Sequence, residues 1–375
     1  MRFFGLLTFF LLLGNAFGQD TIKIGVITDR VGVSKPYSEP ATEGVVFAAD
    51  EINRHGGLLG RKIELLIEDD QSRPDISAAL ARKLVDQGVV FILSVSLSPA
   101  TQQQQTVTME AKVPQMTPMN SADYLTTQLD NPWFWQTGPL GSVQGATLLA
   151  HARSKHLKRV ALVTDNSDLG QAIAKAFRGA FEKSGIQLVA DEVVARGATT
   201  AMPQMQKVRA ANPEAMFLAG VLTAENVLIF RAYKELGVKF PIHSSYNLSV
   251  PIYETVAKGL VDGITFVDAY DPDKPEVKAF VAAYKKATGK DPQNLHGYGY
   301  DGVMLVADAI RRAGSLDREK IRAAMQNTNY AGVMGAKGMH YRFPDGKRTG
   351  FDPNGMVVRV YEKDRQGRVV YVGQK

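Results

Sequence analysis

The stretch IKIGVIT at residues 22–28, followed by EINRHGGLLGRKIELLIEDD at residues 51–70, indicates the fold of this chain. The first segment is short and almost continuously apolar, as expected of a strand whose two faces are both covered by helices. A helical stretch over 41–53 follows it and stops at a pair of glycines, and a second strand covers 63–68. Such a strand–helix–strand unit predicts a parallel, doubly wound α/β sheet.

The same alternation of strands and helices continues along most of the chain. It pauses near residues 137–139 and then restarts in a second series of similar length, which favours two similarly built domains over one large sheet. Residues 268–338 are mainly helical and contain too few strands to fold alone, so we expect them to pack onto one of the two domains. The tail, residues 355–373, has the pattern of a β-hairpin.

The first eighteen residues have the features of an export signal. Arg2 gives a positive start, and residues 3–13 form an apolar run that is shorter than the roughly 20 residues of a membrane-spanning helix. Residues 14–18 then place small residues at the two positions that a signal peptidase reads, which predicts cleavage before Gln19. A membrane anchor and a buried N-terminal helix are the alternatives.

Cysteine is absent from the whole chain. A chain without cysteine has neither a lipid-attachment site nor a disulfide framework. Together with the export signal, this predicts a free, soluble protein of the periplasm that is not a lipoprotein, and it makes a cytoplasmic enzyme a poor interpretation.

The composition is that of a globular protein with a modest positive charge. The net charge is +6 and the pI about 9.2, but the Lys and Arg residues are scattered and form no basic stripe with interleaved aromatic residues. We therefore expect no nucleic-acid partner. Beyond the N-terminal run there is no second long apolar stretch, so we expect no other contact with a membrane.

The sequence contains none of the common catalytic motifs. It has neither a phosphate-binding Gly-Lys-Ser/Thr loop nor a Gly-x-Ser-x-Gly nucleophile elbow. His151 and His156 are close in sequence but have no acidic neighbour, so we interpret them as solvated residues at a helix end. Asp69 and Asp70 are expected to stay solvated at a strand end. These observations predict a protein that is not an enzyme, with no metal and no cofactor.

Several local patterns occur together and in order. They are AADEIN at 48–53, GGLLGRKI at 56–63, the pair Asp69-Asp70, SPAT at 98–101 and the proline-bounded segment 114–118. In this setting the chain resembles the periplasmic leucine/isoleucine/valine-binding protein family, the type I solute-binding proteins of ABC importers. The likeness covers essentially the whole mature chain, and the segment with Glu-Ile-Asn and the following glycines is its most specific part.

The resemblance implies two doubly wound parallel-sheet lobes joined by three hinge crossovers, with a small ligand bound in the cleft between them. It assigns residues 19–138 and 268–338 to the first lobe, and residues 139–267 and 339–375 to the second lobe. It also implies an inner-membrane ABC permease as partner and a monomeric protein. A ligand-sensing module for a membrane receptor would have the same fold and differ only in its partner.

Two serines are candidates for binding a carboxylate. In doubly wound folds the loops after the carboxyl ends of the strands line the ligand crevice. Ser98 begins the helix after the third strand, and Ser121 follows the fourth. A hydroxyl at a helix start, with free first-turn amides and the positive end of the helix dipole, suits a carboxylate. The alternative for Ser98 is an ordinary N-cap.

The resemblance adds candidates on both lobes. Tyr37 matches an aromatic lid over the ligand, although it is otherwise interpreted as a surface tyrosine. The family's amino-acid binders hold the ligand ammonium with an acidic residue of the second lobe, and that position matches Tyr246 here. The full set of candidate ligand-binding residues is Tyr37, Ser98, Met119, Ser121, Leu169, Val221 and Tyr246.

The tyrosine at position 246 points to a particular class of ligand. A neutral phenol cannot offset a buried ammonium, and an unpaired buried charge costs several kcal/mol. We therefore expect a carboxylate without an α-ammonium, such as an aromatic or other organic acid. Arg30 either adds a countercharge or faces solvent. If the alignment shifts by a few residues, Glu225 restores an amine-binding carboxylate, which keeps branched-chain or other amino acids as the alternative.

Overall fold

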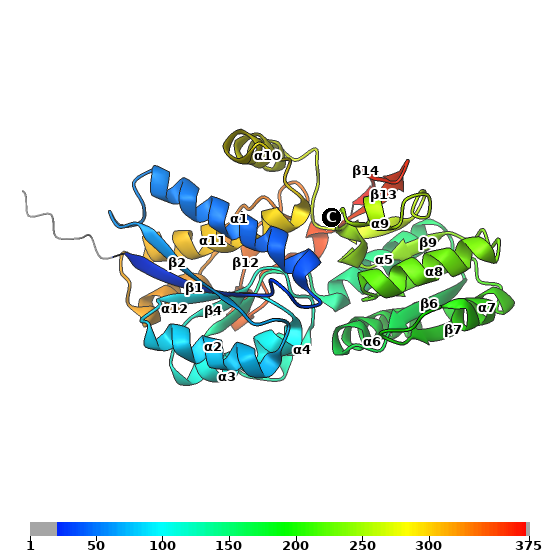
Figure 1. Cartoon of the computed structure of the whole chain (residues 1–375), viewed down its shortest axis with the longest axis horizontal. Coiled ribbons are helices and arrows are strands. Elements are labelled where there is room, and N and C mark those ends of the chain that lie inside the picture. Colours follow the sequence, from blue (N-terminus) through cyan, green and yellow to red (C-terminus); the bar gives the residue numbers. More distant parts are fainter. Residues whose placement is uncertain (1–20, 373–375) are drawn as a thin grey trace, which may run out of the picture.

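The computed structural model describes residues 21–372, which form two α/β lobes side by side (Figure 1). The predicted export signal and its cleavage site before Gln19 lie outside the described residues. No helix within residues 21–372 combines the length and apolar character that a bilayer crossing requires.

The first lobe is built on a five-stranded, wholly parallel sheet with the order β2-β1-β3-β4-β5. Its central strands are apolar on both faces because helices cover both sides, and every residue of β3 is buried. Its elements are β1 (Ile22–Thr28), α1 (Lys35–Arg54), β2 (Ile63–Asp69), α2 (Pro74–Asp86), β3 (Phe91–Val95), α3 (Ser98–Glu110), β4 (Gln115–Thr117), α4 (Tyr124–Thr127) and β5 (Phe134–Gln136).

The helices that follow the second series pack back onto the first lobe, as their lack of strands required. The contact of α11 with α1 is close because it passes over glycines: a Cβ at Gly44 would lie 2.0 Å from the His296 carbonyl oxygen, and one at Gly299 would lie 1.8 Å from that of Ala41. These elements are α10 (Pro275–Thr288), α11 (Asn294–Ala313), α12 (Arg318–Gln326), β11 (Asn329–Tyr330), β12 (Tyr341–Arg342) and the short 3₁₀ turns Pro344–Gly346 and Pro353–Gly355.

The second lobe repeats this plan and extends it. The order β7-β6-β8-β9-β10 reproduces that of the first sheet, and the predicted C-terminal hairpin adds β13 and β14 as antiparallel strands. Its elements are α5 (Gly141–Ser154), β6 (Arg159–Asp165), α6 (Asp168–Glu182), β7 (Gln187–Val194), α7 (Met202–Ala210), β8 (Ala215–Ala219), α8 (Thr223–Glu235), β9 (Ile242–Ser244), the 3₁₀ turn η1 (Tyr246–Ser249), α9 (Tyr253–Val256), β10 (Thr265–Asp268), β13 (Val357–Glu362) and β14 (Arg365–Val372).

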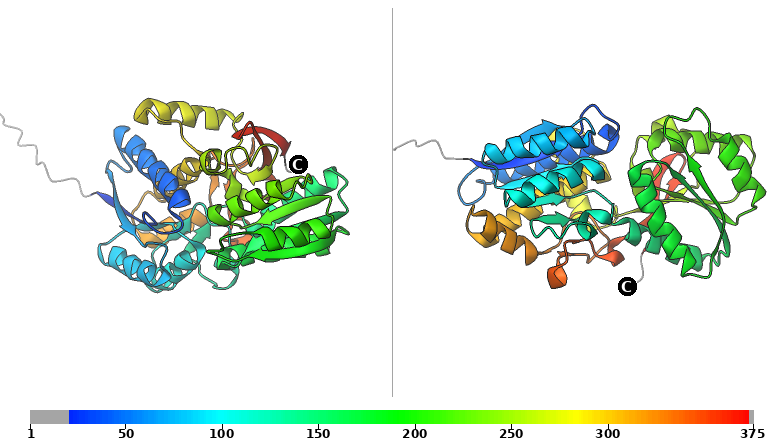
Figure 2. Two further views of the ribbon diagram at one scale, coloured as in Figure 1. Left: turned by 45° about the vertical axis from the view of Figure 1, so that its right-hand side comes forward. Right: turned by 90° about the horizontal axis from the view of Figure 1, so that it is seen from below.

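The chain passes between the lobes three times, and Figure 2 shows the lobes from two further sides. The first two passages lie between β5 and α5 and between β10 and α10, near the predicted positions. The third lies later than the predicted boundary at 338. Backbone hydrogen bonds of 2.8 Å join Gln136 at the edge of the first sheet to Arg348 and to Gly350. A further backbone hydrogen bond of 2.8 Å joins the Ala336 amide to the Gly355 carbonyl. We therefore assign residues 339–355 to the first lobe and place the third crossover between Gly355 and β13.

The histidine prediction is wrong for His151. Its side chain is buried in the second lobe, and its ring lies 5.0 Å from that of the buried His243. Burial lowers the pKa of His151 to about 4 and that of His243 to about 3, and in each case a nearby cation or the other ring adds to the effect. No local sequence pattern reveals this pair, because α5 and β9 meet only in the folded lobe.

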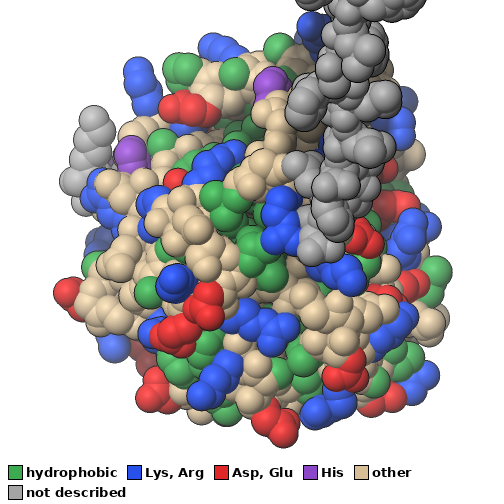
Figure 3. All heavy atoms as spheres, turned by 90° about the vertical axis from the view of Figure 1, so that its left-hand side faces the viewer, with side chains coloured by type: hydrophobic (Ala, Val, Ile, Leu, Met, Phe, Trp, Pro, Cys, Tyr) green, Lys and Arg blue, Asp and Glu red, His purple; other side chains and the backbone are tan. Residues whose placement is uncertain are grey.

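The surface carries charges of both signs. On the face of the first lobe seen in Figure 3, Lys and Arg side chains alternate with Asp and Glu and do not merge into one basic area. This face of the first lobe therefore presents no single basic patch.

Candidate ligand-binding site

The lobes meet around a small cavity at the carboxyl ends of the strands. In the first sheet the strand order reverses between β1 and β3, and in the second between β6 and β8, which are the switch points where doubly wound folds bind ligands. The cavity measures about 20 Å³, room for roughly one water. It is lined by Ser34, Tyr37, Ser96, Leu97, Ser98, Met119, Asn120, Ser121, Leu222, Tyr246 and Asn247.

Three helices begin at this cavity. Ser34 is the N-cap of α1, Leu97 that of α3 and Leu222 that of α8, and all three residues line the cavity. The free amides and the positive dipole ends of helix N-termini attract negative charge. The cavity is therefore electrostatically suited to an anion, unless side chains of the protein already supply the negative charge.

At the start of α1 the protein supplies that charge itself. The carboxylate of Asp29, directly after β1, accepts hydrogen bonds from the amides of Val31 and Ser34 at 3.1 and 2.8 Å and from the Ser34 hydroxyl at 2.7 Å. Burial would raise the pKa of Asp29, but the hydrogen bonds from Ser72, Ser34 and the loop amides together lower it. This helix start is already paired with an anion.

The start of α8 is paired in a similar way. The buried carboxylate of Asp165, at the end of β6, accepts a hydrogen bond of 3.1 Å from the amide of Leu222. Its other oxygen holds the amide of Ser167 at 2.9 Å. The first turn of α8 also contains Glu225. The second lobe thus presents a neutralised helix start to the cavity.

The start of α3 has no such partner. No side chain caps it, and its first turn contains no acidic residue. Ser98 is the first helical residue, and Leu97 occupies the N-cap, so the interpretation of Ser98 as an ordinary N-cap is wrong. Beside it, the buried hydroxyls of Ser96 and Ser121 make no well-formed hydrogen bond. This part of the cavity can accept a carboxylate.

The wall from the second lobe is aromatic and apolar. Tyr246 donates a hydrogen bond of 3.1 Å from its hydroxyl to the Met119 carbonyl of the first lobe, and its amide donates to Gln144 Oε1 at 3.1 Å. Burial raises the pKa of Tyr246 to about 12, and the nearby Ser121 hydroxyl opposes this rise. The phenol is therefore neutral at ordinary pH and carries no charge to pair with a ligand ammonium.

Five of the seven sequence-based candidates line this cavity. They are Tyr37, Ser98, Met119, Ser121 and Tyr246. Val221 is buried but does not line it, and the neighbouring Leu222 does so instead. Leu169 falls in the first turn of α6, but its side chain lies outside the described part of the structure.

Sequence reasoning missed four polar residues of the lining. Ser34, Ser96, Asn120 and Asn247 all lie one to four residues from a predicted candidate or from the end of a strand. A rule that every residue in the first loop after a strand is a candidate would have found Ser34, Ser96 and Asn120, and extending it to the 3₁₀ turn η1 after β9 would have added Asn247. It would also have selected many residues that face elsewhere.

The two charged candidates lie outside the cavity. Glu225 is buried in α8, where its Oε1 lies 3.2 Å from Arg196 Nε and accepts from the Gly197 amide at 3.2 Å. Arg30 is exposed, and it lines a different pocket. Among the cavity-lining residues there is no acidic or basic side chain.

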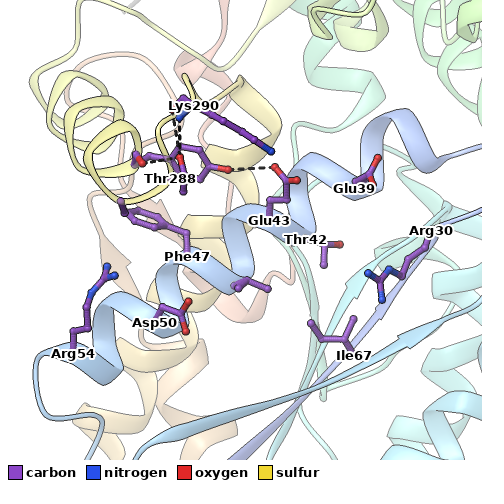
Figure 4. A pocket seen from close by; sticks show the side chains of 13 residues that line it. Arg30, Glu39, Thr42, Glu43, Phe47, Asp50, Arg54, Ile67, Thr288 and Lys290 are labelled. Atoms are coloured by element: carbon purple, nitrogen blue, oxygen red, sulfur yellow. Dashed lines mark hydrogen bonds between the residues drawn. The ribbon is translucent and has the colours of Figure 1, made fainter.

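The pocket that Arg30 lines is larger but of mixed charge. It measures about 420 Å³ and runs along one face of α1, with the end of α10 on one side and Arg30 and Ile67 on the other (Figure 4). Three cations and three carboxylates line it, and Glu43 is already hydrogen-bonded to Tyr284 at 3.2 Å. This balance gives no preference for an anion. Within residues 21–372 there is also no cluster of three or more His, Asp or Glu side chains that could hold a metal ion.

The chain matches a family model over nearly its whole described length. The model is described as "Periplasmic binding protein" and matches residues 21–360. A leucine-, isoleucine-, valine-, threonine- and alanine-binding protein of Pseudomonas aeruginosa is 25% identical over 315 residues, which are 83% of each chain. An amino acid binding protein of the same organism is 28% identical over 323 residues, 84% of this chain and 85% of the relative.

Solved structures show the same fold. A leucine-binding protein from Thermotoga maritima superposes with a TM-score of 0.81 at 26% identity, covering 94% of this chain and 99% of its own. A solute-binding protein of an ABC transporter from R. palustris, in complex with benzoate, has a TM-score of 0.82 at 20% identity and covers 94% of this chain and 96% of its own. The second likeness establishes the fold alone.

Proposed function

The chain belongs to the periplasmic binding protein family, and from this premise we propose that it captures a small organic acid for an ABC importer. In this proposal the protein works in the periplasm, holds the solute between its lobes and delivers it to an inner-membrane permease. The solute is a carboxylate without an α-ammonium, of the aromatic or other organic-acid class.

The bare start of α3 is the observation that carries the proposal. Helices α1 and α8 begin at the same cavity, but Asp29 and Asp165 occupy their first amides. Only α3 is left for a ligand among these three helix starts. A carboxylate placed there would accept from the amides of the first turn and from the hydroxyls of Ser98 and Ser121, and these donors would compensate for its loss of water.

The same cavity gives an ammonium group no partner. It has no lining carboxylate, and Glu225 is held by Arg196 and Gly197 away from the cavity. The uncapped N-terminus of α3, which no carboxylate of the protein neutralises, would repel a cation. Met119, Leu222 and the two tyrosines instead offer apolar and aromatic surface, which suits the carbon skeleton of an organic acid.

Binding would require the lobes to separate and close again. The cavity of about 20 Å³ is far smaller than an organic acid. A hydrogen bond from the Tyr246 hydroxyl of the second lobe to the Met119 carbonyl of the first lobe also holds the lobes together across it. A hinge motion about the three crossovers would open it. Burial of the ligand between the lobes would then favour the closed form, which is the form that a permease can distinguish from the open one.

Amino acids are the second candidate, because relatives with 25 to 28% identity over more than four fifths of the chain are named for amino acids. Calorimetric titration of the ligand-free protein with benzoate and with leucine separates the two. We expect benzoate to bind and leucine to bind at least tenfold more weakly. Tight binding of leucine would reject the organic-acid proposal, and Ser121→Ala, which should weaken benzoate about tenfold, locates the site.

A further inference from the structure

We propose that Tyr37 is a latch: its hydroxyl leaves the cavity wall and docks in a polar socket of the second lobe, and this contact holds the lobes closed over the ligand. The socket consists of Thr223, Asn226, Asn247 and Tyr253. The proposal rests on the proposed function for its ligand, but the latch itself consists only of protein groups.

The central contact crosses from one lobe to the other. Tyr37 lies in the first turn of α1, its ring lines the cavity, and only 5% of the residue is exposed. Its hydroxyl oxygen is 3.2 Å from the Oγ1 of Thr223, the first residue of α8. Tyr37 thus contributes its ring to the ligand cavity and its polar end to the opposite lobe.

The socket is organised by the second lobe without help from Tyr37. Asn226 donates from its Nδ2 to the hydroxyl of the fully buried Tyr253 at 2.9 Å and to the Val221 carbonyl at 2.8 Å. Asn247 is fixed by the Ser245 hydroxyl, which donates to its Oδ1 at 3.0 Å. Polar groups that are already oriented lose little entropy when a partner arrives.

The Tyr37 phenol is placed to act as a neutral hydrogen-bonding group. Burial raises its pKa well above the usual value and Tyr253 raises it further, whereas hydrogen bonding to Thr223 and Asn247 opposes the rise. A buried hydroxyl without a partner is costly, so closing the lobes is favourable for Tyr37 only when the hydroxyl reaches the socket. The consequence is a closed state whose lifetime depends on this contact.

The test separates closure from ligand contact. Thr223, Asn226 and Tyr253 do not line the cavity, so Thr223→Val removes the hydroxyl that pairs with Tyr37 without changing a lining residue. Tyr37→Phe removes the hydroxyl and keeps the ring. Because the chain has no cysteine, Asp86→Cys in α2 and Glu182→Cys in α6, both exposed, allow one dye on each lobe for single-molecule energy transfer.

We expect Tyr37→Phe and Thr223→Val each to increase the dissociation rate of benzoate about fivefold, to leave its association rate within twofold, and to reduce the closed population of the ligand-free protein. Thr223→Ser, which keeps the hydroxyl that Thr223→Val removes, should retain the wild-type rates and closed population. The double variant Tyr37→Phe/Thr223→Val should match either single variant, because the two substitutions remove the same hydrogen bond.

Additive effects of the two substitutions on dissociation, or an unchanged closed population in Tyr37→Phe, would overturn the latch. If benzoate binds none of the proteins, the proposed function fails, but the energy-transfer measurement on ligand-free protein still decides the latch. The latch is supported in either case if the closed population of the ligand-free protein falls in Tyr37→Phe and in Thr223→Val but stays at the wild-type level in Thr223→Ser.

Discussion

Helices α3 and α8 hold equivalent places in the two lobes, yet they meet the cavity in opposite states. Each follows the strand on the second side of a switch point, β3 in one sheet and β8 in the other. The amide of Leu222 at the start of α8 is bound by Asp165, whereas α3 begins without a capping side chain or an acidic first turn. The same fold has therefore produced one helix start that is paired with a carboxylate of the protein and one that is not.

This difference predicts how a ligand is oriented in the cavity. The charged end of a ligand is expected at α3, among the hydroxyls of Ser96, Ser98 and Ser121, and its carbon skeleton against Leu222 and Tyr246. The internal carboxylate of Asp165 performs at α8 what a ligand carboxylate would perform at α3. Comparison with α8 thus shows that the first-turn amides of α3 are not paired with a carboxylate of the protein itself.

The largest effect should come from making α3 resemble α8. Ser98→Asp places a carboxylate at the first turn of α3, where it would satisfy the free amides and repel a ligand anion. We expect benzoate affinity to fall at least a hundredfold by calorimetry, while the melting temperature stays equal or rises, because an acid at a helix start stabilises by about 0.3–1 kcal/mol.

Ser98→Asn is the matched uncharged control and should retain more affinity than Ser98→Asp. Wild-type affinity for benzoate in the Ser98→Asp variant would remove α3 as the anion site. If that variant does not fold, the combination of Ser98→Asn with Ser121→Ala tests the same site without adding a charge.

A smaller effect should distinguish the stability of the two lobes in acid. Burial lowers the pKa of His151 to about 4 and that of His243 to about 3, so the unfolded chain binds more protons below about pH 6.5. Stability from these groups is complete above that pH and is lost as pH falls toward 4. We expect the free energy of urea unfolding of the second lobe to fall by at least about 2 kcal/mol over this window.

The first lobe should respond differently. Burial raises the pKa of Asp301 to about 6, so its contribution to stability increases as pH falls. Burial lowers the pKa of the first-lobe His296, but the Glu43 carboxylate 3.0 Å from its Nε2 opposes this shift. His243→Phe should flatten the acid profile, and the exposed His55→Gln should leave it unchanged. A first lobe that unfolds before the second between pH 6.5 and 4 would contradict this expectation.

A substitution at Tyr246 should change which ligand the second wall accepts. Tyr246→Glu adds a carboxylate where an ammonium would lie, so the ratio of leucine to benzoate affinity should rise about tenfold, equivalent to about 1.4 kcal/mol. Tyr246→Gln, which is polar but uncharged, should leave the ratio nearly constant. An equal ratio in both variants would mean that this position does not face the ligand.

The smallest effect is expected at Arg30. This residue is exposed and lines the pocket along α1 instead of the interlobe cavity, so a countercharge role is not supported by its position. Arg30→Gln should change benzoate affinity less than twofold at about 0.15 M salt, where exposed charges are screened. A loss of tenfold or more would mean that the loop after β1 turns toward the ligand when the lobes move.

The correct sequence predictions rest on local patterns. The apolar runs of β1 and β3 and the serine that opens α3 are visible in a few consecutive residues, and the chemistry of a helix start follows from its position. Leu222 was missed by one residue because Gly220 has a φ of +69°, which turns the loop before α8 in a way that the sequence pattern does not reveal. The third crossover was misplaced because residues 348–350 bond to Gln136, more than 200 residues earlier.

The sequence by itself determined the family and the two α/β lobes, and it predicted the serines that we propose as carboxylate ligands, because alternating strands and helices and the residues at helix starts are encoded over short distances. Only the tertiary structure decided which helix starts are already neutralised. Asp165 and Leu222 are 57 residues apart, Tyr37 and Thr223 are 186 residues apart, and each contact exists only after the chain has brought separate loops to one cavity. The electrostatic character of the site is therefore a property of the packed lobes.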